Sequence, residues 1–297
     1  MTPPGLEHAQ PGKHVGKIPI REVSGLTLRH FGPNLEILAV GDHTFELAIG
    51  VLKDAAVEEF KVVDLANVML AEGLQLPKES QWEGITADAS GRVFMLEENP
   101  GHVFIFDALL QRLLASIELH FHAHHPDFAE LKEAWEKFPN SRGEGLILLE
   151  NGHLLILKEK DPSRLIKFGP HKDAPVGLKP LGHARDFTLP GNKSSRMVPL
   201  AVWKFSKDSA VAFPDLSELK LDHSGKFWVL SDTGRALGRI NGTDQHGHLK
   251  IDLILRLSDT PGLEHPEGLA LLDPDVALVA CDMHEHHTPL YSFKLNT

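Results

Sequence analysis

The chain has 297 residues, of which 42% are hydrophobic and 24% are charged. This is the composition of a globular protein, and it excludes a disordered chain because it supplies enough apolar side chains for a core. The formal net charge is −11 at pH 7, so the phosphates of nucleic acids and anionic membranes would repel the surface. We therefore expect a small-molecule ligand and allow a protein partner, but expect neither nucleic acid nor membrane.

The start of the chain predicts a flexible segment ahead of the folded part. Residues 1–16 are rich in Pro and Gly and contain no apolar core of a signal peptide. The single cysteine, Cys281, excludes an internal disulfide. These features favour a cytoplasmic protein as the chain stands, or an envelope or periplasmic one if a signal has been removed. Residues 17–297 are then expected to form a single domain.

Five segments of the chain resemble one another, and each opens on a short motif ahead of an apolar run. The motifs begin at intervals of 59, 61, 73 and 50 residues, with Ser24, Glu83, Glu144, Ser217 and Glu267. A second acidic residue follows 18 residues later in the first unit and 15 residues later in each of the others: Asp42, Glu98, Glu159, Asp232 and Asp282. This near-constant offset indicates a structural repeat.

In chain order, the apolar runs predict strands separated by turns. Lys17–Val23 is a spare strand ahead of the first unit. Each unit opens on a hairpin, with turn signals such as Ser90-Gly91 and Asn151-Gly152 between its two strands. A third run follows at 46–52, 102–107, 164–169, 236–241 and 289–295, and a fourth run at 112–121, 198–205 and 249–257. Val63–Gly73 and Pro126–Phe138 are predicted helices, and residues 169–193 a long loop.

Four antiparallel strands that recur in this way predict a β-propeller, an all-β fold whose blades stand radially around a channel. The fifth unit ends after three strands, so the N-terminal strand Lys17–Val23 is expected to complete its blade and close the ring. We predict five four-stranded blades with short helical insertions. A sixth blade inside the 73-residue third interval is the alternative.

The two acidic series converge if the first strand of each blade lines the channel. The second strand returns antiparallel, so the start of the first and the end of the second meet at one mouth. Eight carboxylates then surround this mouth, where they either take up protons or bind a cation. Oxygen ligands favour Ca²⁺, with Mg²⁺ or Mn²⁺ as alternatives, and the predicted metal ligands are Glu83, Glu144 and Glu267. The structural alternative is that these acids accept hydrogen bonds from the next blade or suit turns.

Basic and histidine side chains beside these positions are the remaining candidates. Arg142 and Lys158 either pair with the acids or hold an anionic substrate. His43 and His284 follow Asp42 and Asp282, which suits a metal ligand or a general base near neutral pH; solvated loop histidines are the alternative. A second histidine cluster indicates an exposed strand end or a site for a borderline metal: His120, His122, His124 and His125.

The motifs resemble those of the SdiA-regulated domain family, the YjiK-like β-propellers. The matching pieces are SGLT with AVGD, EGITAD with GRVFMLEE, GEGLILL with GHLLILKEKDPSRLIKF, LSELKLD with GKFWVLSD, and PEGLALL, from about Val23 to Leu295. The resemblance implies a propeller and is compatible with a divalent cation, but it implies no particular reaction. The chain differs in having no N-terminal signal or membrane segment, and in having Ser217-Glu218 where the other motifs have Glu-Gly or Ser-Gly.

Three functions follow from these observations. The first is a metal-dependent hydrolase of a small ester, lactone or phosphoester, with a proton shuttle at His43 or His284. The layout is similar at fold level to gluconolactonase, paraoxonase and phytase propellers, which use a channel-mouth cation in this way. The second is a non-catalytic ligand- or protein-binding propeller, with a structural cation or none. The third is a scaffold whose acids only join blades.

Overall fold

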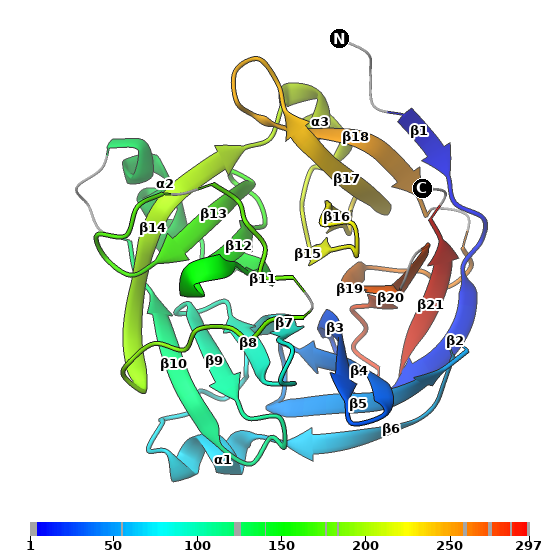
Figure 1. The fold of residues 1–297 in the computed structure, drawn as a ribbon. Coiled ribbons are helices and arrows are strands. Elements are labelled where there is room, and N and C mark those ends of the chain that lie inside the picture. Colours follow the sequence, from blue (N-terminus) through cyan, green and yellow to red (C-terminus); the bar gives the residue numbers. More distant parts are fainter. Residues whose placement is uncertain are drawn as a thin grey trace.

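The computed structural model describes residues 5–54, 56–121, 126–139, 141–175, 177–182, 184–257, 260–272, 275–285 and 287–295. The fold is built almost entirely of strands, which form sheets arranged radially around a central axis (Figure 1). The first sheet has the order β3-β4-β5-β6 and is antiparallel throughout: β3 (Val23–Phe31), β4 (Asn34–Gly41), β5 (Glu46–Lys53) and β6 (Ala56–Asp64).

The second sheet joins two antiparallel four-strand sets edge to edge. One set comprises β7 (Trp82–Ala87), β8 (Val93–Glu97), β9 (His102–Phe106) and β10 (Leu113–Leu119). The other comprises β11 (Gly143–Leu148), β12 (Leu154–Lys158), β13 (Arg164–Gly169) and β14 (Ser194–Lys204). The outer strands β10 and β14 pair in parallel, which makes one eight-stranded sheet.

The two remaining sheets take up the N-terminal strands. In the third sheet, β1 (Gly5–His8) pairs in parallel with β18 of the set β15 (Glu218–Leu221), β16 (Phe227–Ser231), β17 (Ala236–Thr243) and β18 (Leu249–Arg256). In the fourth, β2 (Lys13–Ile18) pairs antiparallel with β21 of the set β19 (Pro266–Leu272), β20 (Val276–Cys281) and β21 (Thr288–Lys294). Both β1 and β2 lie at the outer rim (Figure 1).

The predicted N-terminal strand over Lys17–Val23 was wrong in position, because the strand is β2, at Lys13–Ile18. Pro19 has no N–H to donate to β21, so the ladder ends at Ile18. Ile18 is fully buried, as expected of the anchor of an outer strand. The strand β1 and the first four residues of β2 also fall inside residues 1–16, where the sequence predicts a flexible segment.

Five strands of the described chain surround the axis: β3, β7, β11, β15 and β19. Each contacts the next in this order, and β19 contacts β3. Apolar clusters fill the spaces between neighbouring sets; Trp82 of β7 packs with Leu38 of β4, for example. Strands such as β12, in which every residue is buried, are therefore apolar on both faces until the last residue, Lys158. The inner strands run from one end of the axis to the other, so their two ends define two openings.

Short helices interrupt the sheets. The helix α2 (Pro126–Lys137) is where the sequence predicts it, and its Trp135 packs on Phe121 and Phe168. The helix α1 (Ala66–Ala71) is shorter than the predicted Val63–Gly73, because Val63 and Asp64 still pair in β6. The 3₁₀ turn η1 (Glu150–Gly152) and α3 (Lys207–Ala212) complete the described helices. Among the described residues, none of these helices has the length and apolar character needed to cross a membrane.

Candidate functional site

A β-bulge accounts for the first residue of the repeated motif. The register of the inner strand shifts between Val23 and Gly25, Trp82 and Gly84, Gly143 and Gly145, and Pro266 and Gly268. The residue inside each shift is Ser24, Glu83, Glu144 or Glu267. A bulged residue leaves the ladder, and the bulge re-aims its side chain. In four units the motif residue therefore stands outside the strand ladder, at the same end of the channel.

The glycine after the bulge lets the inner strands approach one another closely. A Cβ atom added at Gly145 would lie 2.6 Å from the backbone nitrogen of Leu219 in the next inner strand. At Gly84 it would lie 3.1 Å from the backbone oxygen of Glu144. The Glu-Gly repeat thus combines an aimed carboxylate with a tight strand contact.

The three inner carboxylates lie close enough to act on one another. Burial raises the pKa of Glu83 well above its usual range, and the negative charges of Glu98, Glu267 and Asp42 raise it further. Burial and the charges of Glu83 and Glu98 act in the same way on the pKa of Glu144. The pKa of Glu267 is likewise raised by burial and then by Asp282 and Asp232. Inner and outer acids from different sheets therefore share one electrostatic site, the acidic end of the channel.

Asp42 and Asp282 both interact with a carboxylate that the repeat did not reveal, Glu22. Burial and then the charge of Glu22 raise the pKa of Asp42 to about 7, and the same two causes raise the pKa of Asp282. In each aspartate the Oδ1 atom is buried without a hydrogen-bond partner in the described structure. Glu22 contacts both predicted histidines: its Oε2 lies 3.3 Å from Nδ1 of His43, and its Oε1 pairs with Nδ1 of His284.

The other outer acids have partners. Oε1 of Glu98 accepts a hydrogen bond from the backbone N–H of Arg142 at 2.8 Å, and burial raises the pKa of Glu98 to about 7. Glu159 forms an ion pair with Nζ of Lys160 at 2.6 Å. Asp232 lies 3.2 Å from Nδ1 of His265. These contacts agree with the structural alternative for part of the outer series.

The predicted substrate-binding cations have structural partners. The guanidinium of Arg142 donates to the backbone oxygen of Trp135 at 2.7 Å and to Oδ1 of Asn99 at 2.9 Å, so it fixes α2 to the β8–β9 turn. Lys158 is fully buried, and its ammonium donates to the backbone oxygens of Ser141 and Lys160. Burial lowers the pKa of Lys158 to about 8. The geometry brings neither side chain to the opening as a free cation.

A ready-made metal geometry is absent from the residues that the structure describes: no three His, Cys, Asp or Glu side chains stand in position to hold an ion. His122, His124 and His125 of the second histidine cluster lie outside the described residues, and His120 lies 3.4 Å from Oε1 of Glu118. A cation at the acidic end would therefore require the carboxylates to rotate toward it. The donor set itself is all oxygen, which suits Ca²⁺.

The two serines of the motif take the structural role instead. Ser24 donates its hydroxyl to the backbone oxygen of Trp82 at 2.6 Å, and Ser217 donates to that of Pro266 at 3.1 Å. Each bond joins one inner strand to the start of the next. The motif position is thus a glutamate in the three units whose carboxylates lie together, and a serine in the two units where its hydroxyl joins two inner strands.

We expect Ser217→Ala to lower the free energy of unfolding by about 1 kcal/mol, because it leaves a buried carbonyl without its donor. Urea denaturation at neutral pH measures the change. Ser195→Ala is the matched control, since the hydroxyl of Ser195 is buried without a partner and its loss should cost nothing. Equal destabilisation by both substitutions would contradict the inter-strand role of Ser217.

Two features of the channel were missed by sequence reasoning. Glu22 stands two residues before its motif, as Gln81 and His265 do, and all three have a left-handed φ, of 47°, 50° and 46°. Glu218 takes the place of the motif glycine and is fully buried; it accepts from the backbone N–H of Leu219 at 2.9 Å and pairs with Nζ of Lys220 at 2.8 Å. The odd Ser217-Glu218 motif was the visible signal for this pair.

Comparison with known proteins bears on the fold. No family model and no curated protein matches the chain. The PQQ-bound aldose sugar dehydrogenase of Streptomyces coelicolor matches with a TM-score of 0.50 at 12% identity, over 99% of both chains. Glutaminyl cyclase of Myxococcus xanthus matches with a TM-score of 0.51 at 10% identity, over 98% of this chain and 97% of its own.

A further match is the β-propeller domain of Cps50 (Swd1) of Myceliophteria thermophila, with a TM-score of 0.48 at 9% identity, over 95% of this chain and 99% of that one. The match to the aldose sugar dehydrogenase, a β-propeller protein, agrees with the predicted fold. At these identities the likeness concerns the fold alone. The resemblance to the SdiA-regulated family stays a prediction.

Proposed function

We propose that this protein is a cation-binding β-propeller that holds a divalent cation, Ca²⁺ in preference to Mg²⁺ or Mn²⁺, at the acidic end of its channel. The observation that carries the proposal is the gathering of the buried Glu83, Glu144 and Glu267, whose pKa values are raised well above the usual range by burial and then by the charges of neighbouring acids. Carboxylates gathered in this way are stabilised by protons or by a cation.

The donor set supports a hard cation. Glu83, Glu144 and Glu267 would hold it, and the unpartnered Oδ1 atoms of Asp42 and Asp282 provide further oxygens nearby. Ca²⁺ accepts irregular arrangements of six to eight oxygen ligands, whereas Mg²⁺ demands an octahedron. When bound, such an ion would polarise an oxygen of a ligand in the channel.

We propose that the propeller has five blades and that the N-terminal strand β2 closes the ring. The five inner strands that contact one another in a ring support this count. The parallel pairing of β10 with β14 supports the division of the eight-stranded sheet into two blades that meet at their rims. In the described part of the third interval, the extra length is a loop and α3, which argues against a sixth blade.

A second candidate is hydrolysis of a small ester, lactone or phosphoester at the same site. One observation favours it: His43 and His284 both contact the carboxylate of Glu22 beside Asp42. The hydrogen bond to Glu22 raises the pKa of His284, so this imidazole can take up a proton near neutral pH. A carboxylate that orients two imidazoles suits proton transfer to a leaving group. The alternative is a propeller that binds its ligand without reaction.

The first test is calorimetric titration of Ca²⁺, Mg²⁺ and Mn²⁺ into protein stripped of metal with EDTA. We expect the tightest binding for Ca²⁺, and a loss of about tenfold or more in affinity for Glu144→Gln, which removes one buried charge. Glu150→Gln is the control, since Glu150 is paired with Lys179 and Arg185 away from the acidic end. Absence of binding to the folded wild-type protein, or equal affinities of Glu144→Gln and wild type, would overturn the proposal.

Hydrolysis is tested separately with a panel of lactones, aryl esters and phosphoesters in the presence of the cation. The hydrolase candidate requires turnover that is lost in Glu144→Gln and reduced in His43→Ala or His284→Ala while the cation affinity of the histidine variants is kept. Cation binding without any turnover would leave the non-catalytic alternative.

A further inference from the structure

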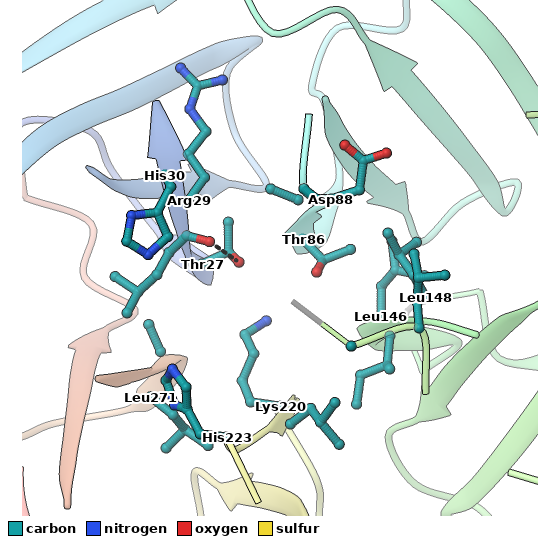
Figure 2. A pocket seen from close by; sticks show the side chains of 18 of the residues that line it. Thr27, Arg29, His30, Thr86, Asp88, Leu146, Leu148, Lys220, His223 and Leu271 are labelled. Carbon is teal, nitrogen blue, oxygen red and sulfur yellow. Dashed lines mark hydrogen bonds between the residues drawn. The ribbon is translucent and has the colours of Figure 1, made fainter. Parts of the chain in front are cut away.

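The end of the channel opposite the acidic site contains a separate cavity of about 360 Å³. Its walls come from later positions of the same inner strands, including Thr27 of β3, Thr86 of β7 and Leu146 of β11 (Figure 2). This volume lies within the range of small-molecule sites, about 300–1,000 Å³. Neither the repeat nor the proposed cation site accounts for it.

The wall of this cavity is mostly aliphatic. It is formed in large part by Leu28, Leu35, Leu146, Leu148, Leu221 and Leu271. Besides Lys220 and the imidazoles of His30 and His223, the ionisable groups of the wall are Arg29 and Asp88, and both are paired: Arg29 bonds to Glu36 at 2.8 Å, and Asp88 bonds to Nε of Arg92 at 2.8 Å. These pairs add little net charge to the interior. A ligand would therefore meet an apolar surface along most of its length.

One ammonium group projects into the middle of the cavity. Figure 2 shows the side chain of Lys220 pointing toward the axis, with the hydroxyls of Thr27 and Thr86 on the facing walls. Its Nζ donates to the backbone oxygen of Ile85 at 3.1 Å and lies 2.8 Å from Oε2 of Glu218. An ammonium has three N–H donors, and among the described residues these two contacts use two of them. One donor is left for a ligand.

Glu218 stands two residues before Lys220 on β15 and forms an ion pair with it. It replaces the glycine of the other motifs, is fully buried, and is held by the backbone N–H of Leu219. Burial raises the pKa of Glu218 to about 7. Near neutral pH its carboxylate can therefore take up a proton at a small cost in free energy. An anion that approaches Lys220 can thus be accommodated by protonation of Glu218 rather than by separation of the pair.

We propose that this cavity binds a small carboxylate with an aliphatic body, with its carboxylate on Lys220 and its hydrocarbon against the leucines. The hydroxyl of Thr86 is a suitable second donor to the same carboxylate, whereas that of Thr27 donates to the backbone oxygen of Leu28 at 3.5 Å. A cationic head would be repelled by the ammonium, and a neutral head would forgo a charge-assisted hydrogen bond. The site uses none of the acidic-end residues, so it does not depend on the proposed cation.

The test is calorimetric titration of the full chain with octanoate, 1-octanol and octylamine. We expect octanoate to bind, with an affinity about tenfold or more above that of the alcohol and no measurable binding of the amine. Lys220→Met, which keeps the length of the side chain, should lower octanoate affinity by about tenfold or more and leave the alcohol unchanged. Lys53→Met is the control, because Lys53 is 68% exposed on β5.

Lys220→Met leaves Glu218 without its partner, so a Glu218→Gln/Lys220→Met double variant is measured beside it. This variant removes both buried charges, and circular dichroism and a thermal melt check its fold. Equal binding of octanoate and octanol, unchanged octanoate affinity in a folded Lys220 variant, or no octanoate binding to wild type would overturn the proposal. Loss of binding in Glu144→Gln or in EDTA would assign the ligand to the acidic end and overturn it as well.

Discussion

In metal-free buffer, the protein is expected to lose stability as the pH rises from about 5 to about 8. Burial raises the pKa of Glu98 and of Asp42 to about 7, and burial together with neighbouring acids raises the pKa values of the three inner glutamates well above their usual range. A carboxyl whose pKa is raised by folding stabilises the native state below its unfolded pKa and loses that contribution as the pH passes its folded pKa. Glu98 alone contributes on the order of 3 kcal/mol to this loss.

The other shifted groups do not reverse this trend. The raised pKa of His284 acts in the same direction. The lowered pKa values of Asp222 and Asp252 change the stability only at a pH below the usual aspartate range. The lowered pKa of Lys158 changes the stability only above about pH 8. The slope between these limits therefore reports the carboxylates of the acidic end together with that of Glu218, whose pKa burial raises to about 7.

Urea denaturation in EDTA at a series of pH values measures this slope. Glu144→Gln should flatten it, because the amide cannot ionise, and Glu150→Gln should leave it unchanged. Saturating Ca²⁺ should restore stability at pH 8 by binding only the native state. A stability that is constant or rises over this pH range would show that contacts within the fold stabilise the ionised acids, as in the scaffold alternative.

The strand pattern could be predicted because it follows directly from apolar runs and turn residues. The third runs of the five units and the fourth runs of three of them correspond to strands such as β9, β13 and β18. The N-terminal strand was misplaced because Lys17–Val23 and Lys13–Ile18 are both short, and only the missing N–H of Pro19 decides between them. The strand β6 of the first unit was missed because its outer face is polar, as in Glu58 and Lys61.

The sequence predicts which acidic residues form the candidate site, but it does not predict which groups the neighbouring side chains contact. A constant offset between two acids is visible in the sequence, and the bulges and antiparallel returns bring these acids to one end. The orientation of a long side chain is not encoded in spacing. Arg142 and Lys158 stand next to the acids in sequence, yet their cations bind backbone carbonyls. Glu22 belongs to no repeated position with a common charge, so only the assembled channel reveals it.

Gly145→Ala is expected to destabilise the protein by about 3 kcal/mol or more, even though it adds a single methyl group. The new Cβ would lie 2.6 Å from the nitrogen and 2.7 Å from the Cβ of Leu219, so two inner strands would have to separate. Overpacking of this kind costs about 1–3 kcal/mol, and more where backbone has to move. The loss should appear as a lower urea midpoint, with weaker Ca²⁺ binding because Glu144 moves with β11.

Gly191→Ala is the matched control, since nothing lies within 4 Å of the position that its Cβ would occupy. This substitution should leave the urea midpoint unchanged or raise it slightly, because alanine restricts the unfolded chain. A Gly145→Ala variant as stable as Gly191→Ala would mean that β11 and β15 can separate freely. The closed ring of inner strands, on which both the acidic end and the Lys220 cavity depend, would then not be rigid enough to hold either site.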